Sequence, residues 1–358
     1  MQATKSPGSF KRQAMNWLAH QWGVLVRAWQ QKPLFSISLA LLVLIVLQTV
    51  SLGFNYPTFG EWFLAWLRNI INVLRNNASV GIIALGMTFV IISGGIDLAV
   101  GSTMVAIGAV VMELINIGPH GILKGIGITG LPAYLIGIAA GILMGIALGE
   151  ITGYLIANKR LPPFIATLGM MKILRSVTQF LTQKSAPIVP KAFLNISNLR
   201  IGGEIVLPII YWLILAVVLH MVSRHTAFGR QVYAIGSNER ASRLSGIHVK
   251  RVKRHVYTLM GAIMSVPAII QISYIGGMDY ANAGAGSEMN AIAAVIVGGT
   301  SMAGGRGSIM GTVLGILTLA VMDNTLNLVG VPAFLREAFK GLIVVAAVLL
   351  QRRDSGSE

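Results

Sequence analysis

The sequence predicts an all-α membrane protein, a bundle of about ten transmembrane helices with both termini in the cytoplasm. Three observations predict this class. Of the 358 residues, 54% are hydrophobic and only 11% are charged, whereas soluble domains are about a quarter charged. Several apolar runs reach the roughly 20 residues that a bilayer crossing needs. Lys and Arg gather between alternate apolar runs, which is typical of cytoplasmic loops. Mean hydropathy is +0.73, and no room remains for a separate soluble domain.

Residues 1–33 form a basic segment before the first apolar run. Its charged residues are Lys5, Lys11, Arg12, Arg27 and Lys32, with no acid among them. This charge places the N-terminus in the cytoplasm. Apolar residues recur within it at roughly helical spacing: Phe10, Ala14, Trp17, Leu18, Leu25 and Trp29. We expect an amphipathic helix in the headgroup plane, and the alternative is a largely disordered tail.

The membrane domain is predicted over residues 34–353, followed by a short tail, 354–358. We expect spans near residues 34–53, 62–92, 102–117, 132–157, 163–182, 207–222, 255–275, 290–303, 309–328 and 334–351. Cytoplasmic segments then hold 18 of the 28 Lys and Arg residues, against four in outside loops, as the positive-inside rule requires. Segment 290–303 is short for a crossing. Segment 62–92 is long, and an interfacial start with the membrane reached near Ala78 would account for its length.

Two glycine-rich stretches interrupt the apolar pattern, Ser93–Ser102 and Gly298–Ser308. Irregular backbone at membrane depth is tolerated where protein buries it or where it lines a wet cavity, and broken helices often surround a substrate path. With the Pro162-Pro163-Phe164 bend, the candidate path residues are Ser93, Gly94, Gly95, Asp97, Phe164, Gly298, Gly299 and Thr300. The alternative is a pair of tight turns whose small residues allow helix packing. Both stretches carry a Gly-Gly pair near their start, Gly94-Gly95 and Gly298-Gly299, and end Gly-Ser, a hint of an internal repeat.

Asp97 is the acidic residue that we single out. An acid at membrane depth is costly and is a functional candidate by default. Its carboxylate could instead cap a helix that begins at Leu98, and proton coupling is a third role. The remaining intramembrane acids are expected to be satisfied packing residues: Glu113, Glu150, Glu288 and Asp323. The six His residues lack metal-ligand spacing and Cys is absent, so we expect no metal site and no disulfide.

The stretch Ser223–Arg254 is a basic island of eight Lys or Arg residues and one acid, Glu239. Within this cytoplasmic loop, Gly236–Gly246 is predicted to form one short helix. Asn238 or Ser237 would be its N-cap, and Gly246 would supply the left-handed residue after its end. Ala241, Leu244 and Ile247 give it a small apolar strip. Such a short helix is marginal alone, which predicts a docking surface for a partner, and the alternative is a solvated basic loop.

Four motifs then carry a family resemblance: IISGGIDLAVGS (91–102), LPPFIATLGM (161–170), HTAFGRQVYAIGSNERASRLSGI (225–247) and AIAAVIVGGTSMAGGRGSIMGT (291–312). In this order they resemble the permease subunits of ribose-type bacterial ABC sugar importers, from about Ile70 to Leu350. The resemblance implies an inner-membrane location, a second permease subunit, identical or different, ATP-binding subunits that hold ATP-Mg, and an external sugar-binding protein. It also implies that the short helix couples to the ATPase through Gly236, Asn238, Glu239, Arg240, Ala241, Arg243, Leu244 and Gly246.

The chain itself contains no G-x-x-x-x-G-K-[ST] phosphate loop, so we expect it to be neither the ATPase nor another enzyme, and to bind no cofactor. The expected substrate is a pentose, a hexose or a related polyol, with nucleosides or a sugar-like signalling molecule as alternatives. The competing class is a stand-alone secondary transporter in which Asp97 or Glu288 couples transport to protons.

Overall fold

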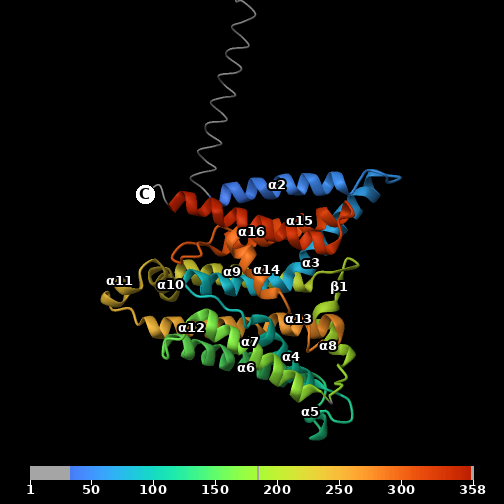
Figure 1. The fold of residues 1–358 in the computed structure, drawn as a ribbon. Coiled ribbons are helices and arrows are strands. Elements are labelled where there is room, and N and C mark those ends of the chain that lie inside the picture. Colours follow the sequence, from blue (N-terminus) through green and yellow to red (C-terminus); the bar gives the residue numbers. More distant parts are fainter. Residues whose placement is uncertain (1–32, 184, 356–358) are drawn as a thin grey trace, which may run out of the picture.

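The computed structural model describes residues 33–183 and 185–355, and the expected N-terminal amphipathic segment and most of the C-terminal tail lie outside this part. The described chain is helical almost throughout (Figure 1). Its helices are α2 (Pro33–Ser51), α3 (Phe59–Ile92), α4 (Val100–Ile115), α5 (Ile122–Gly125), α6 (Leu131–Ala157), α7 (Pro163–Thr182), α8 (Lys191–Asn198), α9 (Leu207–His225), α10 (Ala227–Ser237), α11 (Glu239–Leu244), α12 (Val249–Ile263), α13 (Ser265–Ile275), α14 (Ser287–Val297), α15 (Ile309–Leu328) and α16 (Ala333–Ser355). Strands β1 (Arg200–Ile201) and β2 (Glu204–Ile205) form one antiparallel hairpin.

Within the described residues, six segments are long and apolar enough to cross a membrane: Leu34–Ser51, Phe59–Ile92, Leu131–Ala157, Leu207–His225, Val249–Ile275 and Ile309–Leu328. Helices α4 and α14 are shorter apolar helices. The chain is therefore a multi-pass helical membrane protein, as the sequence predicts, whereas the count of ten spans stays a prediction.

Two expected spans need correction. The span at 290–303 is wrong at its end, because α14 stops at Val297 and the glycines that follow end the helix. The span at 255–275 begins earlier, at Val249, and divides at Met264 into α12 and α13. Residues 249–254, expected in the cytoplasmic loop, therefore belong to a helix. Segment 62–92 is one continuous helix, α3, that starts at Phe59.

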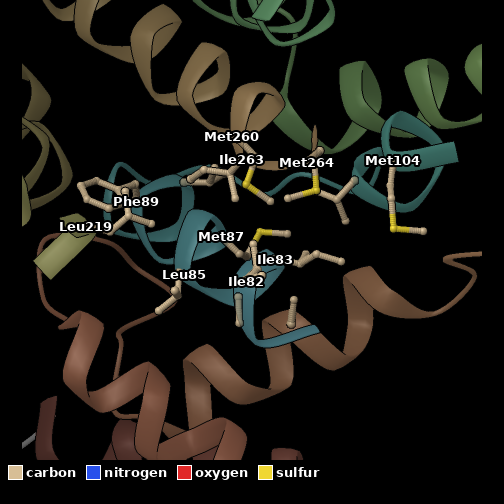
Figure 2. Close-up of a cluster of buried hydrophobic side chains, with 14 of the residues drawn as sticks. Ile82, Ile83, Leu85, Met87, Phe89, Met104, Leu219, Met260, Ile263 and Met264 are labelled. Carbon is tan, nitrogen blue, oxygen red and sulfur yellow. The ribbon is translucent and has the colours of Figure 1, made fainter. Parts of the chain in front are cut away.

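The second half of α3 is the centre of the bundle. Every residue from Gly81 to Ile92 is buried, as expected for a helix that is apolar on all sides. Figure 2 shows its side chains meeting Met104 of α4, Leu219 of α9 and Met260 of α12. Several of these contacts come from methionines, whose unbranched side chains fill irregular gaps. Because lipid tails are as apolar as this core, close packing rather than burial from water holds the helices together.

Helix α6 packs through a stripe of glycines four residues apart: Gly137, Gly141, Gly145, Gly149 and Gly153. All five are buried, and their positions let neighbouring backbones approach. A side chain at Gly149 would overlap the Tyr257 carbonyl of α12, and one at Gly137 would press on Ile115 of α4. Small residues at this spacing are a common device for helix association in membranes.

Helices α2 and α16 attach to one side of the bundle through polar contacts with α15 (Figure 1). The Gln48 amide of α2 donates to Asn324 Oδ1 of α15 over 2.7 Å, and the Asn69 amide of α3 donates to the same oxygen over 3.1 Å. On the other side, Asp323 pairs with Arg336 and Lys340 of α16 at 3.1 and 3.4 Å. Polar side chains thus join α2, α3 and α16 to α15.

The connections gather at two opposite ends of the bundle (Figure 1). At one end, the predicted loop Ser223–Arg254 is mostly helical, because α9 reaches His225 and α10, α11 and the start of α12 follow. Both glycine-rich stretches lie at this same end, since the Gly305 amide donates to the Ile92 carbonyl over 2.9 Å. At the other end lie α5, α8 and the hairpin, and Asn198 of α8 donates to the Ser273 carbonyl of α13 over 2.9 Å.

Candidate functional site

A short helix is present where the docking helix was predicted, but the predicted first residue is wrong. It was expected over Gly236–Gly246, whereas the structure has two helices that meet at Asn238. Gly236 and Ser237 belong to the last turn of α10, and the candidate docking helix is α11, Glu239–Leu244. The sequence analysis missed α10, although Thr226 signals its start by accepting a hydrogen bond from the Gly229 amide over 3.1 Å.

Both ends of α11 are capped as the sequence predicts. Asn238, and not Ser237, is the N-cap, with its side-chain oxygen accepting from the Ala241 amide over 2.9 Å. At the other end Gly246 adopts φ +84°, and the Ile247 amide donates back to the Ser242 carbonyl over 3.0 Å. This is the left-handed glycine cap that ends many helices. The two caps fix a helix that would be too short to persist alone.

Glu239 ties α11 to the long helix α12. Its carboxylate contacts Arg243 within α11 at 2.8 Å and Lys253 of α12 at 2.7 Å. The hydrogen bond from Lys253 is the largest cause that lowers the pKa of Glu239 below its ordinary value of 4.5. A depressed carboxyl pKa contributes stability above about pH 4.5 that is lost as the pH falls through the folded-state value. The ion pairs of Glu239 with Arg243 and Lys253 are therefore fully formed at neutral pH.

The outer face of α11 is apolar at its centre. Leu244, the last residue of α11, is 85% exposed, with Ala241 and Arg240 exposed beside it. The apolar strip predicted from Ala241, Leu244 and Ile247 is thus divided, because Ile247 packs inward against the core. Burying an exposed leucine contributes about 1.5–3 kcal/mol, so this face favours a partner surface.

A cavity of about 470 Å³ lies behind α11. Its lining joins three parts of the chain: Gly94 of the first glycine-rich stretch, Arg160, Pro162 and Pro163 of the α6–α7 turn, and Glu239, Arg243, Lys250 and Lys253 of α11 and α12. The structure therefore brings one candidate path residue, Gly94, next to the candidate docking residues. Phe164 does not join them, since it is 56% exposed in the first turn of α7.

The two glycine-rich stretches end their helices in the same way. Gly94 and Gly299 adopt φ +79° and +83°. After α3, the Gly95 amide donates to the Val90 carbonyl over 2.9 Å, and after α14 the Thr300 amide donates to the Val295 carbonyl over 3.1 Å. This bond pattern around a left-handed glycine defines the Schellman motif. The structure thus gives these glycines a role as turns, and their role in a path stays a prediction.

The second stretch is also clamped to α10. A side chain at Gly236 would overlap the Ile92 carbonyl and crowd the Gly305 amide, so this glycine permits close packing and does not face a partner. The Tyr233 hydroxyl of α10 donates to the Gly307 carbonyl over 2.9 Å. Gly298 lies against the backbone of Gly311 in α15. Helix α10 thus connects α11 to the ends of α3, α14 and α15.

Asp97 is 7% exposed and its Oδ1 accepts the Ala99 amide over 2.8 Å. The helix that follows starts at Val100, so the expected start at Leu98 is wrong, although the carboxylate does satisfy a backbone donor ahead of it. Next to it, the Tyr257 hydroxyl donates to the Ile96 carbonyl over 3.3 Å.

Two further path candidates are internal, whereas Gly94 and Phe164 are exposed. Ser93 is buried and donates to the Val90 carbonyl over 2.8 Å, and Thr300 is fully buried. Three of the remaining acids are satisfied as predicted. Glu150 binds Arg254 and Thr258 of α12, Glu113 accepts from Ser185, and Asp323 pairs with Arg336 and Lys340.

Comparison with known proteins adds the following. A family model described as "Branched-chain amino acid transport system / permease component" matches residues 69–348. A ribose import permease protein of Escherichia coli is 37% identical over 336 residues, which cover 91% of this chain and 95% of that protein. The ribose import permease protein of Bacillus subtilis is 38% identical over 291 residues, or 80% and 85% of the two chains. An inner membrane ABC transporter permease protein of Escherichia coli is 34% identical over 315 residues, or 87% and 91%. No solved structure matches the chain.

Proposed function

The chain belongs to the ABC transporter permease family that includes the ribose import permeases, and from this premise we propose that it is the membrane-spanning subunit of an ATP-driven sugar importer. Its place is the inner membrane, as a multi-pass protein. The proposed substrate is a pentose, a hexose or a related polyol. The proposed partners are a second permease subunit, ATP-binding subunits that carry ATP-Mg and an external sugar-binding protein.

The observation that carries the ATP-driven part of this proposal is the rigid helix α11 with an exposed leucine at its tip. A capped, ion-paired helix that presents Leu244 to water has the properties of a preformed docking element. Preorganisation lowers the entropy cost of association. A transporter that works without an ATPase partner would have no use for such a surface.

We propose that α11 passes the movement of the ATP-binding subunit into the membrane through two rigid links. One link is Glu239–Lys253, which moves α12, and the Arg254–Glu150 ion pair then reaches α6. The other is α10, whose Gly236 and Tyr233 hold the second glycine-rich stretch. Packed elements move as units because their interfaces do not deform continuously. Closure of the partner subunits would therefore displace α6, α12 and the ends of α3 and α15 together.

The proposal is tested by purifying the chain in mild detergent from membranes where it supports uptake. An ATP-binding subunit at equal stoichiometry is expected to accompany it. The variant Leu244→Ser should lose this partner, because removing about 2 kcal/mol of buried leucine weakens binding roughly thirtyfold. Leu199→Ser is the matched control, since this exposed leucine lies at the opposite end of the bundle, between α8 and β1.

Recovery of the chain alone, with uptake intact, would contradict an ATP-driven importer and favour a stand-alone secondary transporter. Equal recovery of the partner with Leu244→Ser and Leu199→Ser would contradict the docking role of α11. In each case the amount of monodisperse chain after gel filtration shows whether folding has been preserved.

A further inference from the structure

A second cavity, of about 380 Å³, opens in the half of the bundle opposite α11. Its polar lining comes from Arg75, Asn76 and Ser79 of α3, Gln271 and Tyr274 of α13, and Ser287 at the start of α14. Asn76 precedes the end of α3 at Ile92 by 16 residues, which is about 24 Å along the helix at 1.5 Å per residue. The volume lies in the range of about 300–1,000 Å³ that is typical of small-molecule sites.

Most polar side chains around this cavity make no hydrogen bond within the part of the chain that the structure describes. Among the residues that the structure describes, the side chains of Asn76, Ser79, Gln271 and Ser287 make no hydrogen bond. Arg75 Nε is buried without a hydrogen-bond partner, and its guanidinium lies 6.0 Å from the centre of the Tyr274 ring.

Elsewhere in the bundle, three side-chain amides do donate hydrogen bonds. Gln48 and Asn69 share the oxygen of Asn324, and Asn77, which directly follows Asn76, donates to the Val73 carbonyl over 2.8 Å. Burying a polar group without a hydrogen bond costs roughly 2–7 kcal/mol, a cost that applies here to Arg75 Nε. Asn76 is exposed, and Ser79, Gln271 and Ser287 are half-buried, so a ligand or water can reach them. Unpaired polar side chains that converge on one cavity inside a membrane protein mark a substrate or ion pathway. The contrast with the paired amides therefore points to a ligand or water in this cavity.

We propose that this cavity is a transient sugar-binding site on the external half of the translocation path, an inference that rests on the proposed function. Amide and hydroxyl groups both donate and accept hydrogen bonds, as the hydroxyls of a neutral sugar do. The guanidinium of Arg75 adds donors, and the Tyr274 ring offers an apolar face to the C–H side of a sugar ring. Ile83 and Met104 are among the apolar residues that line the rest of the cavity.

The first test uses the absence of cysteine from the chain. Ser79→Cys is introduced into the assembled importer in proteoliposomes and treated with a charged, membrane-impermeant thiol reagent. Ser273→Cys is the matched control, because Ser273 lies on α13 but is fully buried and bonded to Ser197 at 2.6 Å. Ser79→Cys should react at least about tenfold faster, since reactivity follows exposure. The transported sugar should slow this reaction.

The second test measures uptake of labelled D-ribose, D-glucose and myo-inositol by the unmodified importer and by Gln271→Leu and Asn76→Leu. Losing a hydrogen bond of about 1.4 kcal/mol should raise the transport KM roughly tenfold in each variant. Gln179→Leu is the control, because it makes the same exchange on α7, away from the cavity lining. Co-purification of the ATP-binding subunit shows that each variant has assembled.

The outcomes separate the two proposals. The unmodified importer must first take up at least one of the three compounds. If it does, an unreactive Ser79→Cys, or unchanged KM values in both leucine variants, would overturn the cavity site without contradicting the sugar-import proposal. If the unmodified importer transports none of the three compounds, the sugar-import proposal fails, and a sugar site in the cavity fails with it. Slowed labelling by the transported sugar, joined to raised KM values, supports both.

Discussion

At the scale of single residues, the most informative position is Asp97, because its carboxylate could cap, contact substrate or carry a proton. The structure gives it one backbone partner, the Ala99 amide at 2.8 Å. An asparagine caps about as well as an aspartate, so this exchange separates hydrogen bonding from charge.

We expect Asp97→Asn to retain sugar uptake near the unmodified level, because the Ala99 amide keeps its acceptor. Asp97→Ala should instead lower stability by about 1 kcal/mol, because the buried Ala99 amide loses its hydrogen-bond acceptor. The measurements are ATP-dependent uptake in proteoliposomes, with and without a proton uncoupler, and thermal unfolding in detergent. A variant Asp97→Asn that folds normally but has lost uptake would show that the charge itself is required.

At the scale of elements, the glycine stripe of α6 sets how closely α6 and α12 approach. Gly145 and Gly149 lie against the backbone of Gly261 and Tyr257, and the Glu150–Arg254 ion pair fixes the same interface. This pair of helices is one of the two links that we propose from α11 into the membrane. Its stability therefore bears on both folding and transport.

The variant Gly149→Leu should destabilise the protein, because its Cβ would overlap the Tyr257 carbonyl. Overpacking of this kind costs about 1–3 kcal/mol, which should appear as a lower unfolding temperature in detergent. Gly169→Leu is the control, since Gly169 is also helical, in α7, and has open space around its Cα. Equal unfolding temperatures for the two variants would contradict close packing between α6 and α12.

At the scale of the whole molecule, the two ends of the bundle have different functions in our proposals. Helices α10 and α11 and both glycine-rich stretches form the end that faces the ATP-binding subunit. Helices α5 and α8 and the hairpin form the end that faces the sugar-binding protein, and the proposed sugar cavity lies in that half. This assignment requires that the residues at the two ends lie on opposite sides of the membrane.

We expect a thiol at His120→Cys to be labelled in intact spheroplasts by an impermeant reagent, and one at Ser245→Cys only after the membrane is broken. Both positions are exposed, so they differ in sidedness and not in burial. His120 follows α4 at the outer end, and Ser245 follows α11. Labelling of both residues from the same side would contradict the proposed topology, and with it the cytoplasmic location of α11.

Much of this architecture could be predicted from the sequence. Most of the expected spans coincide with long helices of the structure within a few residues, and Asn238 and Gly246 cap α11 as predicted. These features depend on local composition and on short-range hydrogen bonds, so the chain encodes them within a few residues. The glycine stripe of α6 could also have been identified from the sequence, since glycine recurs at every fourth residue from Gly137 to Gly153.

By itself, then, the sequence determined the membrane class, the bounds of the long helices and the family, because apolar length, charge asymmetry and ordered motifs are written along the chain. Only the tertiary structure decided that Gly236 packs on Ile92, that Tyr233 reaches Gly307 and that Gln271 shares a cavity with Asn76. Residues so far apart in the chain are brought together by the packing of whole helices, which no local pattern specifies.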